Sequence, residues 1–591
     1  MILLTTLNSK YIHTSLALYS LQAYCQREFA KIEVKEFNIN QDLGFILGEI
    51  YKSQPQVLGI STNIWNITQS LEVMERVKKV MPETIVILGG PEASADYDSI
   101  LRQAVAPDFI VRGEGEETLR ELLGFIETGK PDLQTLPGLA FKNGDQICLT
   151  PLRPPLDLEK IPFPYPDPAV FRNRLVYYES SRGCPFHCAY CLSGWEEANL
   201  RYLPVERVKA DLTRFIEAGV GTVKLIDRTF NLHRHRALEI MEFLAGQEGK
   251  TEFHLEMVGE LIDEQIIHLL QTAPPGRFRV EIGVQSTCEK ALAAVNRRYD
   301  LERLRHNCLA ITHGRRTTVH LDLIAGLPYE DLETFSHSFD WTFRLHPDEL
   351  QLGFLKLLKA SPLRTKAREY GYLYTQTPPY ELLQSKWLPF KDLLHLKAVE
   401  EMVEKFFNSK QFSSTLAYLF REETASPWHF FSTLAQFWEE HQLRGRAQKP
   451  ATFFNGLWSY FQTTSCGANE LEKLRDLLTF DFYLSGSGGK APDWLTPQAP
   501  SLRERVKSIL NEEGQAKLFL PAELKPAALR RRMITLALRI DPETGVERIS
   551  PLLIYTPAQG RPSWFRLPVA DLNLPNQKEK VAPPPTGGED R

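Results

Sequence analysis

Short apolar segments alternate with helical patterns twice along this chain, and this alternation constrains its fold more than any other feature of the sequence. The segments between the first strand candidates include 15–28 and 66–80, where apolar residues recur every three or four positions, as on one face of a helix. Parallel strands need long crossovers, which are usually helices. The first series therefore predicts a parallel sheet with helices on both faces. Its strand candidates are 2–7, 34–37, 57–61, 85–88 and 109–111.

A second series of strand candidates follows a proline-rich stretch. Residues 131–172 include seven prolines between Pro151 and Pro168, a composition typical of a stiff linker between domains. Six strand–helix units after this stretch predict a complete or partial parallel barrel. In barrels of this kind the chemistry lies at the carboxyl ends of the strands. The strand candidates of this series are 175–181, 222–227, 253–257, 278–284, 319–324 and 349–355.

The remaining third of the chain has a different character. Beyond about residue 370 the pattern is mainly helical and aromatic, and it holds six of the nine tryptophans. A strand pair is expected at 533–540 and 552–555. A chain of 591 residues divides into several domains. The predicted divisions are an α/β domain at 1–130, a linker at 131–172, a barrel at 173–365, a mainly helical domain at 366–576 and a disordered tail at 577–591.

Composition disfavours several classes of protein. Lys and Arg number 69 against 74 Asp and Glu, so the net charge of -5 provides no broad basic surface for a nucleic acid. No stretch approaches the ~18 consecutive apolar residues that span a bilayer, and the first residues do not resemble a signal peptide, so a cytoplasmic protein is expected. Eight cysteines are too few for a disulfide scaffold in a chain of this length. Three of them fall within eight residues, which favours a metal or redox site.

The three clustered cysteines directly follow the first strand candidate of the second series. They are Cys184, Cys188 and Cys191, with the spacing C-x3-C-x2-C, and Gly183 before them permits a tight turn. Three thiolates on one loop can ligate three irons of a 4Fe-4S cluster and leave the fourth iron open to another ligand. A zinc site is the alternative, with His187 as a fourth ligand, although His187 lies beside Cys188 at a poor spacing for one tetrahedral ion.

Small residues follow three strand candidates of the first series. Ligands of parallel sheets bind beyond the carboxyl ends of the strands, and small residues there let a large ligand approach the backbone. None of these segments matches the dinucleotide fingerprint G-x-G-x-x-G, so a nicotinamide or flavin site has no motif behind it. The alternative is that the glycines only make tight turns. The candidate binding residues are Ser61, Thr62, Gly89, Gly90 and Gly113.

The cysteine loop, with the aromatic Tyr190 just before its third cysteine, resembles the signature of the radical SAM superfamily. The α/β domain before it carries Gly-Gly-Pro at 89–91 and Gly-Glu-Gly-Glu at 113–116, and this order of domains resembles the radical SAM enzymes with a cobalamin-binding domain. Segments 7–13 and 226–231 further resemble an uncharacterised branch of that group, whose C-terminal third is a domain of unknown function. The resemblance implies an α/β fold with a flavodoxin-like (Rossmann-like) parallel sheet, then a partial (β/α)6 radical SAM barrel, then a mainly helical domain.

The resemblance also implies a set of cofactors. Cys184, Cys188 and Cys191 would hold a 4Fe-4S cluster whose open iron is chelated by the amino and carboxylate groups of S-adenosylmethionine. Polar residues at the barrel strand ends would hold the amine or ribose of that molecule, although each can equally be a helix cap, and the Gly-Gly-Glu common in the family is replaced at 227–231. Cobalamin would bind without a histidine ligand, because the motif D-x-H-x-x-G is absent from 1–150. The candidates for S-adenosylmethionine are Tyr190, Asp227, Asn231, Glu256, Glu281 and Gln285.

The resemblance implies an oxygen-sensitive radical SAM enzyme. It would cleave S-adenosylmethionine reductively and, with cobalamin, methylate or rearrange a small molecule, using an electron donor such as flavodoxin or ferredoxin. One alternative is an enzyme that uses the radical without cobalamin, as a cyclase or an RNA methylthiotransferase-like enzyme does, but the acidic balance of charges disfavours RNA. Another alternative is a zinc-binding or corrinoid-binding protein without catalysis. The sequence identifies neither the substrate nor a catalytic residue.

Overall fold

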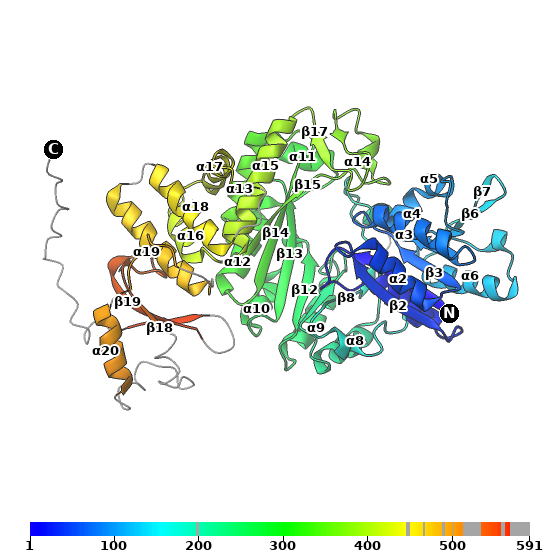
Figure 1. The fold of residues 1–591 in the computed structure, drawn as a ribbon, viewed down its shortest axis with the longest axis horizontal. Helices are drawn as coiled ribbons and strands as arrows, with labels where there is room; N and C mark the ends of the chain where they lie inside the picture. Colours follow the sequence, from blue (N-terminus) through cyan, green and yellow to red (C-terminus); the bar gives the residue numbers. More distant parts are fainter. Residues whose placement is uncertain are drawn as a thin grey trace. The chain divides into compact units, whose positions relative to one another are not determined.

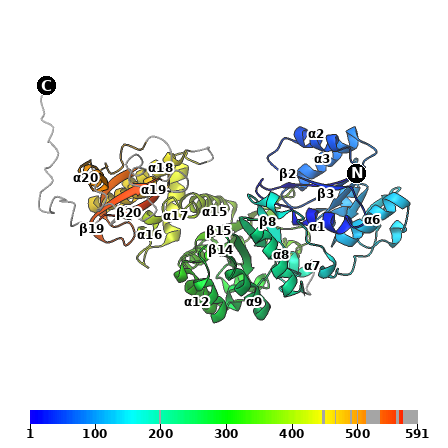
Figure 2. The ribbon, with the colours of Figure 1, turned by 90° about the horizontal axis from the view of Figure 1, so that it is seen from below.

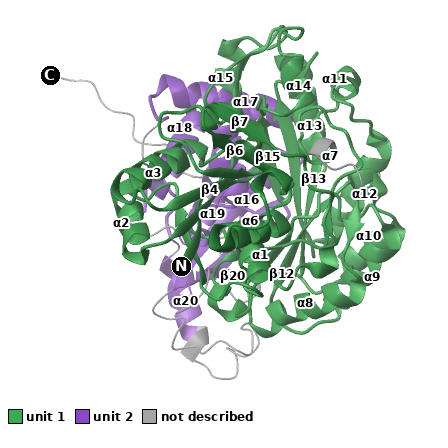
Figure 3. Cartoon of the chain, turned by 90° about the vertical axis from the view of Figure 1, so that its right-hand side faces the viewer, with its two compact units in different colours: residues 1–396 green, residues 397–591 purple. Residues whose placement is uncertain are grey.

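Two compact units make up the chain in the computed structural model, residues 1–396 and residues 397–591 (Figure 3). No helix in the described part of the chain combines the length and the apolar character needed to cross a membrane. The predicted tail at 577–591 and Cys466 lie outside the described residues. The structure describes residues 1–196, 200–444, 449–464, 467–486, 491–498, 500–511, 533–556 and 562–567.

Residues of the first series form a seven-stranded sheet in the order β2-β1-β3-β4-β5-β6-β7 (Figure 1). Its strands are β1 (Ile2–Asn8), β2 (Ile32–Asn38), β3 (Val57–Ser61), β4 (Ile85–Gly89), β5 (Phe109–Val111), β6 (Leu139–Asn143) and β7 (Gln146–Leu149). The first five strands pair in parallel, and their order is that of flavodoxin-like sheets, which confirms the predicted fold. The sheet also extends into the predicted linker, because β6 pairs antiparallel with β5 and buries Leu139, Ala140 and Phe141.

Helices cover both faces of this sheet (Figure 2). α2 (Leu43–Ser53) and α3 (Ile67–Val80) pack on one face, and α1 (Leu16–Cys25) and α6 (Glu116–Thr128) pack on the other. Successive side chains of a strand point to opposite faces, so β1 contributes alternate residues to two separate buried clusters. Because both faces of the strands are buried, only the strand ends and the loops after them are free to carry a site.

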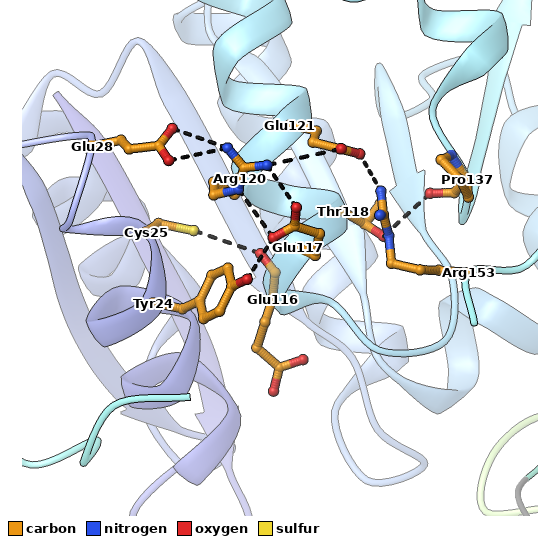
Figure 4. A network of polar contacts seen from close by, with 10 residues as sticks. All are labelled: Tyr24, Cys25, Glu28, Glu116, Glu117, Thr118, Arg120, Glu121, Pro137 and Arg153. Carbon is orange, nitrogen blue, oxygen red and sulfur yellow. Dashed lines mark hydrogen bonds and ion pairs between the residues drawn. The ribbon is translucent and has the colours of Figure 1, made fainter. Parts of the chain in front are cut away.

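Charged side chains join α1 to the first turns of α6 (Figure 4). Arg120 donates to Glu117 at 2.6 Å and to Glu28 at 3.1 Å. Tyr24 donates to Glu117 at 2.5 Å, so α1 and α6 are held in one orientation. The carboxylate of Glu116, at the start of α6, points away from this network. It is therefore free to contact another part of the unit.

The second series forms a six-stranded sheet in the order β15-β14-β13-β12-β11-β8, with every neighbouring pair parallel (Figure 1). β8 and β15 stay at opposite edges of this sheet, so the predicted partial (β/α)6 barrel is confirmed. Its strands are β8 (Leu175–Tyr178), β11 (Thr222–Leu225), β12 (Glu252–Met257), β13 (Phe278–Gln285), β14 (Thr318–Ala325) and β15 (Glu349–Phe354). The main helices between them are α8 (Val205–Glu217), α9 (Arg234–Ala245), α10 (Glu264–Thr272), α12 (Leu301–Gly314) and α13 (Leu332–Phe343).

Side chains of the two central strands β13 and β14 alternate between two environments. Along β13 and β14, fully buried residues such as Val280 and Leu321 alternate with partly exposed ones. The partly exposed positions include the charged residues Glu281 and Asp322. One face of the sheet is therefore an apolar surface packed under helices, and the other, inner face is polar and partly open to solvent.

The second unit is mainly helical, as predicted. Its aromatic residues form a core: Trp438 is 1% exposed, and its ring centroid lies 5.2 Å from that of Phe406. The predicted strand pair is present as β18 (Met533–Ile540) and β19 (Glu547–Tyr555), and β20 (Ser563–Arg566) pairs with β19. The helices that lie wholly in this unit include α16 (Ser413–Leu419), α17 (Pro427–Glu440), α18 (Pro450–Thr463), α19 (Ala468–Leu484) and α20 (Pro500–Asn511).

Candidate active site

The three clustered cysteines lie on a loop at the carboxyl end of the barrel sheet. β8 leads through the short strand β9 (Ser181–Arg182) into Gly183, whose φ of +102° suits glycine alone. Cys184 is 7% exposed, Cys188 is 6% exposed, and Cys191 is partly buried. None of the three forms a disulfide bond. The sequence spacing thus corresponds to three reduced thiols, two buried and one partly buried, on one loop.

Backbone contacts hold this loop from several sides. The N–H of Ala189 donates to the carbonyl of Val295 at 2.9 Å, and the N–H of Leu363 donates to the carbonyl of Ala189 at 2.9 Å. The loop also packs closely on itself, because a Cβ atom added at Gly194 would lie 1.7 Å from the carbonyl oxygen of Phe186. Segments far apart in the sequence therefore fix its conformation.

The chemistry of these three donors fits a 4Fe-4S cluster. Burial raises the pKa of the Cys184 thiol, and the nearby thiols of Cys191 and Cys188 raise it further, so three thiolates here need a compensating positive charge. A metal centre supplies that charge. Among the described residues, no three His, Cys, Asp or Glu side chains are arranged to hold a metal ion, and His187 is exposed. Thiolates that each bind a different iron of a cluster need not converge on one point.

Two residues predicted to contact S-adenosylmethionine are engaged inside the protein. Asp227 is 1% exposed and accepts hydrogen bonds from the N–H and hydroxyl of Ser180, at 3.0 and 2.6 Å, and from the hydroxyl of Ser181 at 2.5 Å. Asn231 donates to the carbonyl of Val258 and accepts from its N–H, both at 2.9 Å. Asp227 thus ties the end of β11 to the segment that leads into the cysteine loop, and Asn231 ties the segment after β11 to the end of β12.

Two other predicted contacts lie on the polar inner face of the barrel. Glu256 on β12 and Glu281 on β13 are neighbours in register, and Lys224 on β11 pairs with both, at 3.1 and 2.8 Å. Nε2 of His254 lies 2.8 Å from Glu281. Burial alone would raise the pKa of Glu281, but His254 and Lys224 hold it well below its usual range. We call these four residues the inner-face cluster.

Sequence reasoning missed Lys224 and His254 as site residues. Their signal was a polar residue at every second position of β11 and β12, which places these side chains on the inner face. Of the remaining predicted contacts, Gln285 ends β13 with φ +67°, where the pairing with β14 is irregular. The hydroxyl of Tyr190 accepts a hydrogen bond from Nη1 of Arg297 at 3.1 Å.

The turn that follows β4 in the N-terminal domain requires glycine, and it packs against Thr62, which follows β3. Gly90 has φ +99°, and a Cβ atom there would lie 2.3 Å from the carbonyl oxygen of Thr62. The Thr62 hydroxyl is buried, donates to the carbonyl of Gly89 at 2.7 Å and accepts from the N–H of Ala93 at 3.1 Å. Thr62 therefore shapes the turn from within. Ser61, which ends β3, is only partly buried.

Arginines near the cysteine loop contact the loop after β5 in the N-terminal domain. Arg182, just before the cysteines, pairs with Glu114 at 3.2 Å and with Glu116 at 2.9 Å. Arg201 also pairs with Glu114. Gly113, a predicted cobalamin contact, begins this loop with φ +73°. Ion pairs thus tie the loop predicted to face cobalamin to the loop predicted to hold the cluster, within one compact unit.

Glu330 is a buried carboxyl group in the loop between β14 and α13. It is 1% exposed, and the hydroxyl of Ser286 donates to it at 2.5 Å. Burial raises the pKa of Glu330 to about 8, whereas a glutamate in an unfolded chain titrates at about 4.3. Between these two pH values the folded protein holds a proton that the unfolded chain lacks. The free energy of unfolding therefore falls as the pH rises through this window.

We expect Glu330→Gln to flatten this pH dependence. Between pH 6 and pH 8, Glu330 should lower the free energy of unfolding of the wild type by up to ~1.4 kcal/mol per pH unit, a loss that the uncharged amide does not suffer. Unfolding by denaturant at both pH values measures the difference. Glu333→Gln, at an exposed position of α13, is the matched control and should keep the wild-type slope. Equal slopes for the wild type and Glu330→Gln would contradict the assignment.

Families of known proteins match three successive parts of the chain. The B12 binding domain matches residues 2–123, and the radical SAM superfamily matches residues 178–342. A protein family of unknown function (DUF4080) matches residues 368–541. These parts follow the order that the sequence predicted.

Curated relatives cover part of the chain. The cobalamin-dependent radical SAM methyltransferase TokK of Streptomyces tokunonensis is 26% identical over 344 residues, which cover 54% of this chain and 50% of TokK. The anaerobic magnesium-protoporphyrin IX monomethyl ester cyclase of Rubrivivax gelatinosus is 24% identical over 314 residues, which cover 50% of this chain and 55% of the cyclase. The chain thus spans about half the length of the curated relatives it matches.

Solved structures share the fold. The cobalamin-dependent S-adenosylmethionine radical enzyme OxsB, with aqua-cobalamin bound, has a TM-score of 0.58 at 15% identity and covers 81% of this chain and 79% of its own. The radical S-adenosylmethionine methyltransferase TsrM from Kitasatospora setae has a TM-score of 0.53 at 17% identity and covers 63% of this chain and 77% of its own. At these identities the likeness concerns the fold.

The matched domains carry the identification of the cofactors. A radical SAM domain implies a 4Fe-4S cluster and S-adenosylmethionine, and a B12 binding domain implies cobalamin. The fold and the cysteine loop agree with this set. The chain therefore contains, in order, a B12 binding domain, a radical SAM domain and a C-terminal domain of unknown function.

Proposed function

We propose that this enzyme transfers a methyl group from S-adenosylmethionine to a small molecule, with cobalamin in the N-terminal domain and a 4Fe-4S cluster at Cys184, Cys188 and Cys191. One observation carries the proposal. The ion pairs of Arg182 with Glu114 and Glu116 bring the loop after β5 next to the cysteine loop, at the carboxyl ends of the parallel strands of both sheets. In parallel sheets these ends are where ligands bind.

The protein's part in this chemistry is to hold the reactants and to exclude water. When bound at Cys184, Cys188 and Cys191, the cluster would supply the electron for reductive cleavage of S-adenosylmethionine, and cobalamin would supply a carrier for the methyl group. The burial of Cys184 and Cys188 and the hydrogen bonds that fix their loop keep the cluster ligands in place. Gly89, Gly90 and Gly113 let a large ligand approach the backbone of the N-terminal domain.

The inner-face cluster is the proposed recognition surface for the polar parts of the bound molecules. Glu256, Glu281 and Lys224 are partly exposed, with side-chain exposures of 16–23%, whereas His254 beside them is buried. The Lys224 cation and the two carboxylates offer both donors and acceptors to a polar molecule. Asp227 and Asn231 already bond to other parts of the protein: Asp227 holds the segment before the cysteine loop, and Asn231 holds the end of β12. A small-molecule substrate and an electron donor such as flavodoxin or ferredoxin complete the proposal, and a reducing cytoplasm suits free thiols.

A cyclase-type radical enzyme is the second candidate function. It is favoured by the similarity to the anaerobic magnesium-protoporphyrin IX monomethyl ester cyclase, which nearly equals the similarity to TokK in identity and coverage. The two candidates differ in what becomes of S-adenosylmethionine. Methyl transfer leaves S-adenosylhomocysteine, whereas radical generation leaves methionine and 5'-deoxyadenosine.

Product analysis of the full chain separates the two candidates. The protein is reconstituted anaerobically with iron and sulfide, and then incubated with S-adenosylmethionine and titanium(III) citrate, with or without cobalamin. We expect 5'-deoxyadenosine in both samples and S-adenosylhomocysteine only in the sample with cobalamin. If 5'-deoxyadenosine forms but S-adenosylhomocysteine never does, the cyclase-type function is favoured. If neither product forms from protein that retains its iron, both candidates fail.

A further inference from the structure

A partly buried arginine, Arg297, lies against the cysteine loop. Its Nη1 is 3.8 Å from Sγ of Cys188 and donates to the hydroxyl of Tyr190 at 3.1 Å. Its Nη2 donates to the carbonyl of Gly283 at 3.0 Å. The guanidinium carbon also lies 4.6 Å from the ring centroid of Tyr299. One cation thus connects the cysteine loop to the carboxyl end of β13.

The segment that carries Arg297 is itself bonded to the cysteine loop. Two residues before it, the carbonyl of Val295 accepts the N–H of Ala189, which lies between Cys188 and Tyr190. The backbone of Val295 and the side chain of Arg297 therefore contact the same short stretch of the loop. A movement of this segment would move Cys188 and Tyr190 with it.

The charged guanidinium of Arg297 lies beside the Cys188 thiol. Its side-chain hydrogen-bond partners are a thiol, a phenol and a carbonyl group. Burial raises the pKa of the Glu260 carboxyl group, and a backbone hydrogen bond and the charge of Arg297 oppose this rise. Of the hydrogen-bond partners of Arg297, Cys188 is the one that gains a negative charge when it binds a metal.

We propose that Arg297 positions the stretch from Cys188 to Tyr190 and raises the reduction potential of the iron–sulfur cluster bound there. The inference rests on the proposed function, because it requires a cluster at the three cysteines. Reduction adds one negative charge to the cluster, and a cation beside a ligating sulfur stabilises that charge. Hydrogen bonds and charges around the sulfurs are known to set cluster potentials. A higher potential makes the cluster easier for an electron donor to reduce.

Arginine can both supply a positive charge and fix the position of the loop, and replacing it with lysine keeps the charge but loses part of the fixed geometry. The planar guanidinium is always charged, and its forked donors reach the sulfur, the phenol and the carbonyl at once. Lysine would keep the charge with fewer fixed contacts. Glutamine would remove the charge. The three side chains therefore distinguish an electrostatic effect from a purely structural one.

The test compares Arg297→Gln with Arg298→Gln in the full, reconstituted chain. Arg298 is the next residue and is exposed, so both variants change the net charge equally. The midpoint potential of the cluster is measured by redox titration, with the reduced cluster followed by electron paramagnetic resonance. We expect Arg297→Gln to make reduction at least tenfold less favourable, which is 59 mV for a one-electron couple. Arg298→Gln should shift the equilibrium less than threefold.

Two further variants keep the outcome decisive. Arg297→Lys and Tyr190→Phe both retain a cation near Cys188, so each should shift the reduction equilibrium less than tenfold. A midpoint in Arg297→Gln equal to that of the wild type would overturn the inference. If Arg297→Gln does not retain iron, Arg297→Lys decides: a tenfold loss despite the retained charge contradicts the electrostatic role. A wild-type chain that binds no iron contradicts the proposed function and this inference with it.

Discussion

Replacing Cys188 with alanine is expected to abolish assembly of the iron–sulfur cluster. Iron after anaerobic reconstitution should fall from about four atoms per chain to background, because two thiolates cannot hold a cubane that needs three protein ligands. Production of 5'-deoxyadenosine should disappear with the iron. Cys188 is 6% exposed, so circular dichroism should accompany the iron analysis to show that the variant is folded.

Cys148→Ala is the matched control for this substitution. Cys148 is a partly buried cysteine on β7 in the N-terminal domain, and it packs against the apolar core there. Its loss removes one sulfur from the chain without touching the cysteine loop. Iron content should stay at the wild-type value. Full iron content in Cys188→Ala would show that the three thiols do not act as one ligand set.

Replacing Gly90 with alanine is expected to disrupt the predicted cobalamin site. Gly90 has φ +99° and ψ 173°, a conformation that is essentially restricted to glycine. The new Cβ atom would lie 2.3 Å from the carbonyl oxygen of Thr62, so the turn between β4 and α4 (Pro91–Ala95) must move. Backbone strain alone should lower the free energy of unfolding by about 1–3 kcal/mol. Cobalamin retained after gel filtration, measured from its visible absorption, should fall at least tenfold.

Gly48→Ala provides the control for the Gly90 variant. Gly48 lies within α2, and a Cβ atom there would have nothing within 4 Å. Alanine favours a helix by about 1 kcal/mol over glycine, so this variant should be as stable as the wild type or more stable. Its cobalamin content should be unchanged. Wild-type cobalamin binding by Gly90→Ala would place the corrinoid away from the turn after β4.

Much of the fold followed from periodicity. The near-continuous apolar runs at 57–61 and 85–88 became central parallel strands, and the six strands of the barrel fell in chain order. The antiparallel hairpin β6–β7 was hidden inside the predicted linker by the prolines that follow it. Its turn contains Asn143 and Gly144, a pair typical of hairpin turns, so the signal was present but outweighed.

Sequence reasoning predicted the cysteine loop correctly but missed residues whose partners lie far away in the sequence. The cysteines are close in sequence, so their loop could be recognised from spacing alone. Asp227 reaches Ser180 across 47 positions, and Arg182 reaches Glu116 across 66 positions. Contacts between residues so far apart in sequence depend on how the chain packs, which local sequence patterns do not reveal. Sequence reasoning therefore chose Asp227 as a ligand contact and did not identify Arg182, Lys224 or Arg297 as site residues.

The contact between the two predicted cofactor loops gives the N-terminal domain a second task besides binding. Arg182 pairs with Glu114 and Glu116, and it is also paired with Glu179 at 2.7 Å on its own domain. Burial would lower the pKa of Arg182, but these carboxylates raise it, so the arginine stays charged. Removing one partner from a charged network of this kind destabilises the protein, because the remaining charge is left without its partner. It holds the two loops in a fixed relation.

Counting the cofactors of one chain is the most direct test that both sites exist together. The full protein is purified without oxygen from cells supplied with cobalamin, and iron, sulfide, zinc and corrinoid are measured per chain. We predict about four irons, about four sulfides and about one corrinoid per chain, with zinc at background. Stoichiometric zinc without sulfide, or a full iron–sulfur content without any corrinoid, would contradict the assignment of a cluster and cobalamin to this one chain.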